Sequence, residues 1–465
     1  MILRMTDLGA AGNGKTVHTG LLQQAIDSCY EAGGGTVLLD HGTYVSGTLH
    51  LKSGVTLEIA VSAILLASPD IRDYGDDTHY NRYKNETDMD RCFIYAEDQE
   101  DICIKGQGQI CGNEGAFPNP GSIYRPMLIR FLRCTRIRLE GVRLIDSAAW
   151  NTAFLDSSYI WVRDVEIKNY RKYNGDGLNF DGCRHVFVDG CSITGTDDNL
   201  CLQAGSKDYP VEGIHISNCE FTSICAAIRI GLKSIGDIRD VVISNCTMRN
   251  VWKEGIKVEC TEGGNISDIT ISNITMQSVS KPIYILLNNR YAPGQPGNSI
   301  GLNRVPEIGT LKRLMFTNII AVDGPELFGA QLRFGRDLMG ASWFNGIRVD
   351  AEADHQIEDL TFANIRYTSA GGVKLTDIPE TYPPVLDQLI HPDEVTSGNY
   401  YPDWSRTAFM DIRNVKGLYL SNVVFASQRP DERPAWLLEG CDICKQEIDV
   451  LTGTALTGTE RNGND

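Results

Sequence analysis

A short phrase of β-forming residues returns along most of the chain, and this repeat restricts the fold more than any other feature. Each copy holds one or two β-formers, a polar pair that often ends in Asn, Asp or Gly, and another β-former. In six copies the polar marker is Gly141, Asp164, Gly190, Asn218, Asn245 and Asn273. Successive markers are 23, 26, 28, 27 and 28 residues apart. The phrase persists in FTNI, FANI and LSNV, which begin at Phe316, Phe362 and Leu420.

The length of this period selects the fold class. A unit of about 20–30 residues that consists of short β-runs and leaves no room for a helix is typical of a β-solenoid. A propeller blade needs about 40 residues, and a leucine-rich repeat needs a leucine scaffold that this sequence lacks. We therefore predict an all-β chain folded as a right-handed parallel β-helix, with equivalent residues of neighbouring coils about 4.8 Å apart.

The residues before the repeats predict a short N-terminal capping helix at 21–30, with Thr19 as candidate N-cap. Such a helix would cover the open end of the solenoid core. Just before it, Gly9 to Thr16 (GAAGNGKT) match a phosphate-binding loop, but that loop requires a buried strand before it and a helix directly after it. Since both are missing, we interpret the motif as a Gly-rich turn.

We expect one domain, with the cap at residues 1–50, plain coils at 51–290 and insertion-rich coils at 291–465. The stretches 71–91 and 291–404 are too polar and irregular for plain coils. Long insertions on a rigid scaffold either line a binding site or decorate the surface.

Charge and cysteine content exclude several classes of partner. The chain has 43 basic and 60 acidic residues and a net charge of −17, which disfavours nucleic acid as a partner.

We see neither a membrane span of ~18 apolar residues nor a signal peptide, so we expect no membrane partner and a cytoplasmic protein. We interpret the 14 cysteines as reduced core residues. Cys441 and Cys444 have the spacing of half a zinc site, but we interpret this spacing as chance.

The densest polar sequence lies in two successive repeats, at 174–182 (NGDGLNFDG) and 195–205 (GTDDNLCLQAG). Aligning their inward apolar residues places Asp176 level with Asp198, one coil apart, with Asp197 beside them. Like charges this close raise one pKa and leave another low, which suits acid and base catalysis of glycoside cleavage. A calcium site and a ladder of Asp and Asn turns are the alternative interpretations.

The same alignment extends to CAAIRIG at 225–231 and EGIKVE at 254–259. Its outward column continues through Arg229 and Lys257. Two cations about 5 Å apart are best explained by an anion, or by Glu254 or Glu259, between them.

These motifs resemble those of the polygalacturonase family, glycoside hydrolase family 28. The similarity runs from DLGAAGNGKT through RPMLIRF and IDSAAWN to about Tyr291, well over half of the chain. The family's Asn-Thr-Asp motif appears as Asn174-Gly175-Asp176 and its Gly-Asp-Asp motif as Thr196-Asp197-Asp198. The resemblance implies a β-helix that hydrolyses pectic galacturonides with inversion. It implies Asp197 as general acid, Asp198 with Asp176 as the groups that hold and deprotonate water, and Asn174 as a substrate-positioning residue.

Two family motifs are altered. Arg-Ile-Lys appears as Gly255-Ile256-Lys257, which keeps the lysine that grips a sugar carboxylate and loses the arginine. Gly-His-Gly is replaced by Cys225-Ala226-Ala227. We infer that Arg229 substitutes for the missing arginine beside Lys257, with a structural salt bridge as the alternative. Tyr291 matches a family position at which a tyrosine contacts the sugar.

We therefore expect an inverting glycoside hydrolase that acts on a pectic oligosaccharide or polysaccharide, without metal or organic cofactor. Insertions that close one end of a cleft favour exo-action on an α-linked galacturonide. An α-L-rhamnosidase or rhamnogalacturonan hydrolase is the alternative, because the sugar contacts are altered. A calcium-dependent lyase, which would give a product absorbing in the ultraviolet, and a non-catalytic glycan-binding β-helix are further alternatives.

Overall fold

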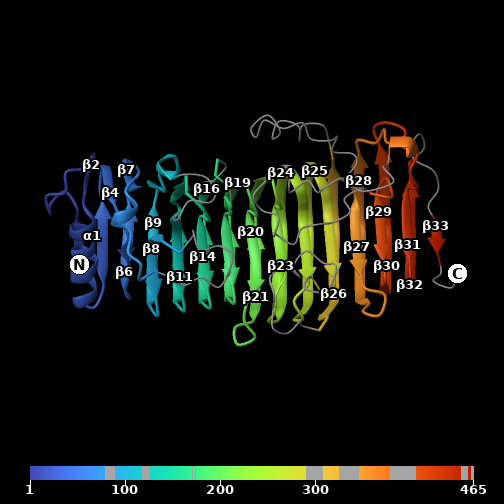
Figure 1. The fold of residues 1–465 in the computed structure, drawn as a ribbon, viewed down its shortest axis with the longest axis horizontal. Helices are drawn as coiled ribbons and strands as arrows, with labels where there is room; N and C mark the ends of the chain where they lie inside the picture. Colours follow the sequence, from blue (N-terminus) through green and yellow to red (C-terminus); the bar gives the residue numbers. More distant parts are fainter. Residues whose placement is uncertain are drawn as a thin grey trace. The chain divides into compact units, whose positions relative to one another are not determined.

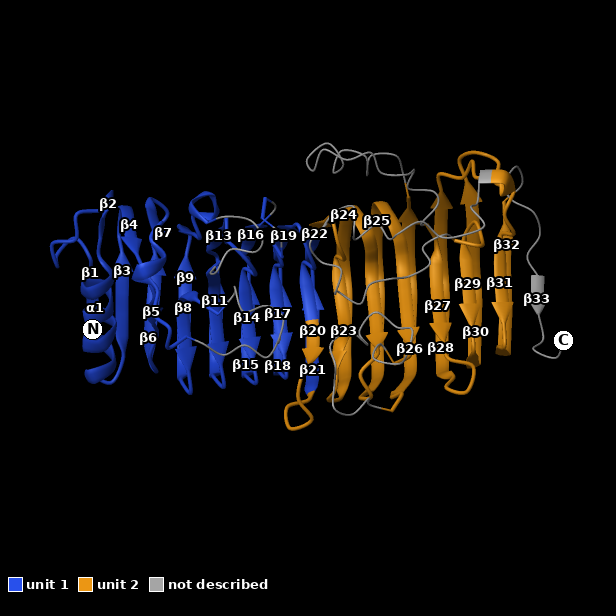
Figure 2. Ribbon diagram, viewed as in Figure 1, with its two compact units in different colours: residues 1–201, 211–220 blue, residues 202–210, 221–465 orange. Residues whose placement is uncertain are grey.

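The computed structural model describes residues 1–78, 90–117, 125–169, 171–172, 174–289, 307–323, 345–377, 405–451 and 459–461. In these ranges parallel strands make up nearly all of the regular structure, and an α-helix lies near the N-terminus (Figure 1). The predicted right-handed parallel β-helix is confirmed. The chain divides into two compact units, unit 1 (1–201 and 211–220) and unit 2 (202–210 and 221–465) (Figure 2). The single domain with three parts stays a prediction.

Unit 1 begins with the helix and contains the shorter strands. Its elements are β1 (Ile2–Arg4), β2 (Asn13–Val17), α1 (Thr19–Glu31), β3 (Gly35–Leu39), β4 (Gly42–Ser46), β5 (Leu49–His50), β6 (Val55–Ile59), β7 (Ala63–Ala67), η1 (Ile71–Asp73), β8 (Cys92–Glu97), β9 (Glu100–Gly106), β10 (Gln109–Cys111), η3 (Glu114–Ala116), β11 (Met127–Leu132), β12 (Thr135–Glu140), β13 (Arg143–Ile145), β14 (Thr152–Leu155), β15 (Ser158–Arg163), β16 (Glu166–Asn169), β17 (Leu178–Asp181), β18 (Arg184–Asp189), β19 (Ser192–Gly195) and β21 (Val211–Ser217). Strands β20 (Leu200–Ala204) and β22 (Glu220–Ser223) have residues in both units.

Unit 2 contains longer strands that continue around the corners of a coil. Its elements are β23 (Ile228–Ser234), β24 (Ile238–Cys260), β25 (Asn265–Leu287), β26 (Thr310–Val322), β27 (Ile347–Ala351), β28 (Ile357–Ser369), η7 (Leu375–Asp377), β29 (Met410–Arg413), β30 (Val415–Ser427), β31 (Trp436–Glu439), β32 (Asp442–Val450) and β33 (Thr459–Arg461).

Coils of three strands build unit 1. From β3 onward each strand pairs in parallel with the strand three places further along, as β11 does with β14 and β14 with β17. Inward side chains stack in columns, and the Phe154 ring lies 5.9 Å from Phe131 and 5.2 Å from Phe180. The Leu178 N–H donates to the Asn199 carbonyl over 2.9 Å, as expected when Leu178 pairs with the residue after Asn199. The predicted register of the two polar repeats is confirmed.

Helix α1 differs from its prediction at the start. It begins at Thr19, and its N-cap residue is His18, which makes no side-chain capping bond. The prediction of Thr19 as N-cap is wrong, because its hydroxyl instead accepts a hydrogen bond from the Gly47 N–H over 2.8 Å. The apolar side of the helix, which includes Leu22 and Ile26, is buried. This apolar burial is what a capping element must supply.

The GAAGNGKT segment forms a turn and then strand β2, rather than a helix N-terminus. The Asn13 side-chain oxygen accepts hydrogen bonds from the Lys15 and Thr16 N–H groups, both over 2.9 Å. Strand β2 pairs with β4 in parallel. The segment therefore lacks the geometry of a phosphate-binding loop, as the sequence predicts.

An asparagine ladder explains the polar marker of the repeat. In unit 2 the markers Asn245, Asn273, Asn318, Asn364 and Asn422 all have left-handed backbones, with φ between 51° and 57°. Each side-chain nitrogen from the second residue onward donates to the side-chain oxygen one rung earlier, over 2.9 or 3.0 Å. Asparagine suits this turn because it tolerates the left-handed conformation and can bond along the stack.

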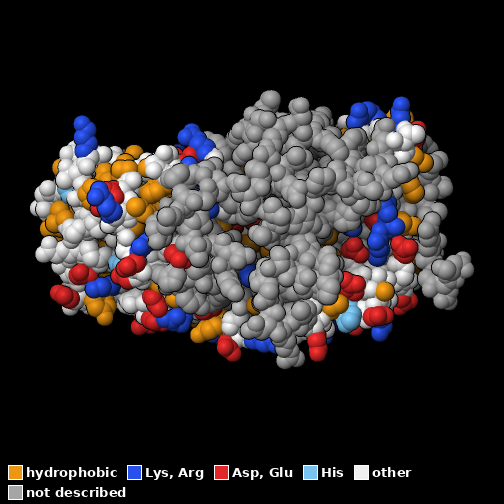
Figure 3. Space-filling model, in the orientation of Figure 1, with side chains coloured by type: hydrophobic (Ala, Val, Ile, Leu, Met, Phe, Trp, Pro, Cys, Tyr) orange, Lys and Arg blue, Asp and Glu red, His pale blue; other side chains and the backbone are white. Residues whose placement is uncertain are grey.

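Charged side chains also pair between rungs. Arg133 Nε lies 2.7 Å from Asp98 Oδ1 in unit 1, and Arg313 Nε lies 2.6 Å from Asp268 Oδ1 in unit 2. Acidic and basic groups are interspersed over the coloured parts of the face in Figure 3. Exposed pairs of this kind contribute little stability each, but they keep like charges from stacking.

The cysteines are free, and eleven of the 14 are buried, in agreement with their interpretation as reduced core residues. Cys103 and Cys441 are partly exposed and Cys444 is exposed, so these three are not core residues. No helix in the described ranges is long and apolar enough to cross a membrane.

The ladder generates a stability prediction at Asn273. We expect Asn273→Ala to lower the free energy of unfolding by roughly 1–3 kcal/mol, because it loses ladder bonds and strains a left-handed residue. Asn273→Gly should lose less of the free energy of unfolding, since glycine adopts the left-handed backbone conformation without strain. Denaturant unfolding of both variants measures the difference. Equal losses would contradict the backbone explanation.

Candidate active site

The turn before β17 carries Asn174 and Asp176, and local contacts fix its path. Asn174 has a left-handed backbone, with φ 50°. The Asp176 carbonyl accepts a hydrogen bond from the Asn169 side chain over 3.1 Å. A Cβ at Gly175 would overlap the Thr196 hydroxyl and the Asn169 carbonyl. Glycine therefore allows the close packing of this turn on the next one.

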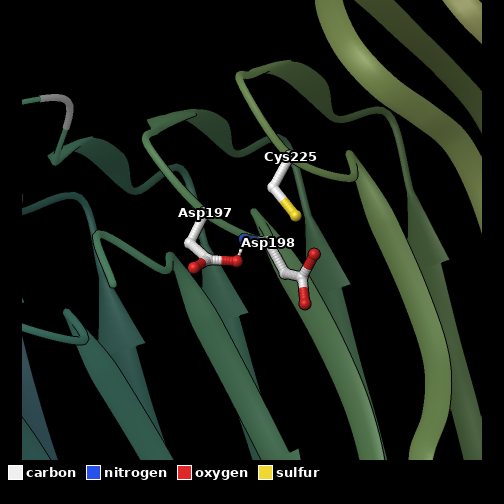
Figure 4. A group of neighbouring side chains, drawn as sticks. All are labelled: Asp197, Asp198 and Cys225. Carbon is white, nitrogen blue, oxygen red and sulfur yellow. Dashed lines mark hydrogen bonds between the residues drawn. The ribbon is translucent and has the colours of Figure 1, made fainter. Parts of the chain in front are cut away.

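The next turn, between β19 and β20, carries Asp197 and Asp198 (Figure 4). The Asp198 N–H donates to Asp197 Oδ1 over 2.9 Å, which orients that carboxylate. The Gly177 N–H donates to the Asp198 carbonyl over 3.0 Å, so the two turns lie side by side. Asp176 and Asp198 are buried, whereas Asp197 is partly exposed. The three predicted carboxylates thus occupy adjacent turns of unit 1.

The thiol of Cys201 contacts the buried carboxylate. It donates from strand β20 to Asp198 Oδ2 over 3.5 Å. Carboxylate oxygens such as those of Asp197 and Asp198 would also suit a hard cation. The absence of a metal stays a prediction. Cys225, which Figure 4 also draws, comes from unit 2 and is buried there.

Arg125 supports Asn174, a role that the sequence did not reveal. Its side chain is buried, and its Nη2 donates to Asn174 Oδ1 over 2.8 Å. This bond holds the Asn174 amide in one orientation. Arg125 lies in the RPMLIRF stretch of the family resemblance, but it precedes β11, two coils before β17, so no short spacing links it to Asn174.

Glu114 is a second group that sequence patterns missed. It is 4% exposed in η3, and its Oε1 lies 3.5 Å from Arg171 Nε. Lys172, on the same loop as Arg171, donates its ammonium to the Phe117 carbonyl. Burial, and then the charge of Asp146, raise the pKa of Glu114 to about 7, against the two cations. An acid that binds its proton near neutral pH therefore adjoins the loop that leads into β17.

In unit 2, Arg229 and Lys257 lie opposite each other in the parallel pair of β23 and β24, as predicted. Arg229 Nε donates to Glu259 Oε2 over 2.8 Å, and Glu259 Oε1 is 3.7 Å from Lys257 Nζ. Glu254 Oε2 lies 3.6 Å from the same ammonium. All four side chains are at most 7% exposed. Glu259 is therefore a carboxylate held between the two cations, which the sequence offered as one of its explanations.

The carboxylates keep Lys257 charged. Burial disfavours its ammonium form, but the charges of Glu254 and Glu259 outweigh burial and raise the pKa of Lys257. A guanidinium has five N–H donors, so the bond between Arg229 and Glu259 is compatible with a further contact to a ligand.

The space that the family arginine would need is closed at Gly255. A Cβ there would lie 2.9 Å from both the Met276 sulfur and the Pro282 carbonyl oxygen. The second of these is backbone and cannot rotate away. This packing gives a physical reason for the altered motif. Tyr291, the remaining predicted contact, lies outside the described residues.

Comparisons with known proteins show which family the sequence matches. The profile of glycosyl hydrolases family 28 matches residues 35–320. A probable polygalacturonase of Vitis vinifera is 28% identical over 283 residues, which cover 55% of this chain and 56% of that protein. An exopolygalacturonase of Zea mays is 25% identical over 334 residues, which cover 68% of this chain and 75% of that protein. The chain thus spans little more than half of the grapevine relative.

Solved structures give the same fold. The family 28 exopolygalacturonase of Yersinia enterocolitica matches with a TM-score of 0.69 at 19% identity, covering 99% of this chain and 79% of that chain. The exopolygalacturonase of Thermotoga maritima matches with a TM-score of 0.60 at 19% identity, covering 79% and 87%. At these identities the likeness concerns the fold.

The packing at Gly255 predicts a cost for any side chain there. We expect Gly255→Ala to lower the free energy of unfolding by about 1–3 kcal/mol, as overpacking of a filled interior does. Gly20→Ala is the matched control, because a Cβ at Gly20 meets nothing within 4 Å. Denaturant unfolding compares the two variants. Equal stability of Gly255→Ala and the parent would contradict the closed-space explanation.

The raised pKa of Glu114 predicts a pH-dependent contribution to stability. Since its pKa is higher in the folded state, Glu114 stabilises the fold fully below about pH 4.5, and this contribution is lost as the pH rises through about 7. As the pH rises from 4.5 to 7.5, the thermal unfolding midpoint of the parent should therefore fall relative to that of Glu114→Gln. A constant difference between the two proteins across this range would contradict the assignment.

Proposed function

We propose that the chain, which belongs to glycosyl hydrolases family 28, is an inverting hydrolase that removes terminal sugars from pectin-derived galacturonides. The observation that carries the proposal is the set of three carboxylates, Asp176, Asp197 and Asp198, on adjacent turns. The relatives from Zea mays and Yersinia enterocolitica are named exopolygalacturonases, which supports attack at a chain end.

In this mechanism Asp197 is the general acid, and Asp198 with Asp176 forms the base. Inversion requires one carboxyl that protonates the leaving oxygen and one carboxylate that takes a proton from water on the opposite face of the sugar. Asp197 is the more exposed of the three, as suits a group that must reach the leaving oxygen. The buried Asp198 is oriented by Cys201, as suits a group that holds a water molecule in one place.

Sugar recognition uses the remaining residues. Arg229 and Lys257 bind the carboxylate of a galacturonate unit, and Asn174, fixed by Arg125, positions the sugar beside the acid. The N–H donors of Arg229 and Lys257 suit the carboxylate of an acidic sugar better than rhamnose, which carries no charge. Guanidinium at position 229 takes the place of the arginine that cannot fit at Gly255. Tyr291 is proposed as a further sugar contact.

We expect the protein to hydrolyse digalacturonate into two galacturonate molecules, and the newly formed reducing end should appear with inverted, β anomeric configuration in NMR spectra of the fresh product. Asp197→Asn should be slower by about 10²–10⁴-fold, the usual contribution of general acid catalysis. Asp164→Asn is the matched control, because Asp164 is an exposed aspartate in a left-handed turn of unit 1.

Each other outcome has a distinct meaning. An Asp197→Asn variant as fast as the parent would contradict the acid role. Rhamnose released from a rhamnogalacturonan oligosaccharide, with digalacturonate untouched, would favour the neutral-sugar alternative. A product that absorbs in the ultraviolet and disappears with chelator would favour a lyase.

A further inference from the structure

Thr196 joins the two turns of unit 1 that carry the three aspartates. It is 1% exposed and directly precedes Asp197. Its N–H donates to the Asn169 carbonyl over 3.0 Å and to the Gly175 carbonyl over 3.2 Å. Its hydroxyl donates to the Lys172 carbonyl and accepts a hydrogen bond from the Gly175 N–H over 3.0 Å. One buried residue of the second turn is therefore bonded to the first turn through both its backbone and its side chain.

The carbonyl that accepts the Thr196 hydroxyl belongs to a residue with a second anchor. The Lys172 ammonium donates to the carbonyl of Phe117, which directly follows η3. Lys172 is thus held at two points, through its side chain by Phe117 and through its carbonyl by Thr196. The hydroxyl of Thr196 therefore links the second turn to a fixed point of the first.

The position of this hydroxyl requires glycine at residue 175. A Cβ at Gly175 would overlap the Thr196 hydroxyl oxygen, so a side chain at either position excludes one at the other. The family motifs Asn-Thr-Asp and Gly-Asp-Asp have threonine where this chain has Gly175, and glycine where it has Thr196. The two residue types are therefore exchanged in this chain, which indicates that the space between the turns holds one side chain.

We propose that Thr196 is a positioning residue that fixes the spacing between Asp197 and the base formed by Asp176 and Asp198. The inference rests on the proposed function, in which Asp197 is the acid. Asp197 follows Thr196 and Asp176 follows Gly175, so the hydrogen bonds between Thr196 and Gly175 hold the acid and the base in register. Inversion requires a set distance between the two carboxyl groups, because a water molecule must fit beside the sugar. Thr196 acts through this spacing and does not touch the reacting atoms.

The test replaces the hydroxyl and keeps the shape of the side chain. We expect Thr196→Val to lower kcat on digalacturonate by about 10- to 100-fold with little change in KM, because small displacements of catalytic groups slow the chemical step. The pH profile of kcat should also shift, since the spacing of like charges sets their pKa values. Thr196→Ser keeps the hydroxyl and should retain most of the activity. If Thr196→Val does not fold, Thr196→Ala takes its place in every measurement.

Thr48→Val is the matched control for the loss of a buried hydroxyl. Thr48 is also buried in unit 1, and its hydroxyl donates to the Cys92 carbonyl over 2.8 Å and accepts from the Gly75 N–H over 3.1 Å. This variant should keep the kcat and the pH profile of the parent. Equal values of kcat for Thr196→Val and Thr48→Val would overturn the positioning role.

Hydrogen exchange separates this inference from the proposed function. Peptides that contain Gly175 should exchange faster in Thr196→Val than in the parent or in Thr48→Val, because the Gly175 N–H loses its acceptor. Equal exchange in the three proteins would show that the hydroxyl does not join the turns, and would overturn the inference whatever the substrate. A parent that does not hydrolyse digalacturonate, with exchange as expected, would instead refute the proposed function.

Discussion

The stacking of coils at one strand spacing is the constraint on which the rest of this molecule depends. Every outward side chain has neighbours about 4.8 Å away on the coils before and after it. An amide can bond to its own kind at that distance, as Asn273 does. Like charges repel each other at that distance, so a charged side chain needs either an oppositely charged partner or a catalytic role that uses the repulsion. Lys257 in unit 2 has opposite partners in Glu254 and Glu259, whereas the three aspartates of unit 1 would use their repulsion in the proposed mechanism.

The contacts of Glu259 show how buried charges can be held rigidly. Glu259 uses one carboxylate oxygen for Arg229 and the other for Lys257, which fixes both cations in place. Removing these charges from water has an unfavourable free energy, and this desolvation takes place when the protein folds rather than when a ligand binds. Preorganised charge of this kind is more effective than flexible charge, because little reorganisation accompanies recognition.

The repeat made much of this architecture predictable. Because the period fixes which residues are neighbours, the sequence predicted that Asp176 lies level with Asp198 and that Arg229 faces Lys257. It did not reveal Arg125 or Glu114, since their partners lie in turns of other coils at irregular separations. The N-cap at Thr19 was mispredicted for a related reason, as its hydroxyl has a tertiary partner in Gly47. Periodicity predicts register, whereas side-chain partners in turns depend on three-dimensional packing.

The tight contact at Gly255 has a consequence for which sequences this fold can accept. An arginine at this position would meet Met276 and the Pro282 carbonyl, and the fold would lose stability whatever the side chain added to sugar binding. A larger side chain at position 255 therefore requires compensating changes at Met276 and in the backbone at Pro282. The choice of residue at this position is set by the packing beneath it, so sequence variation here is limited by stability before binding.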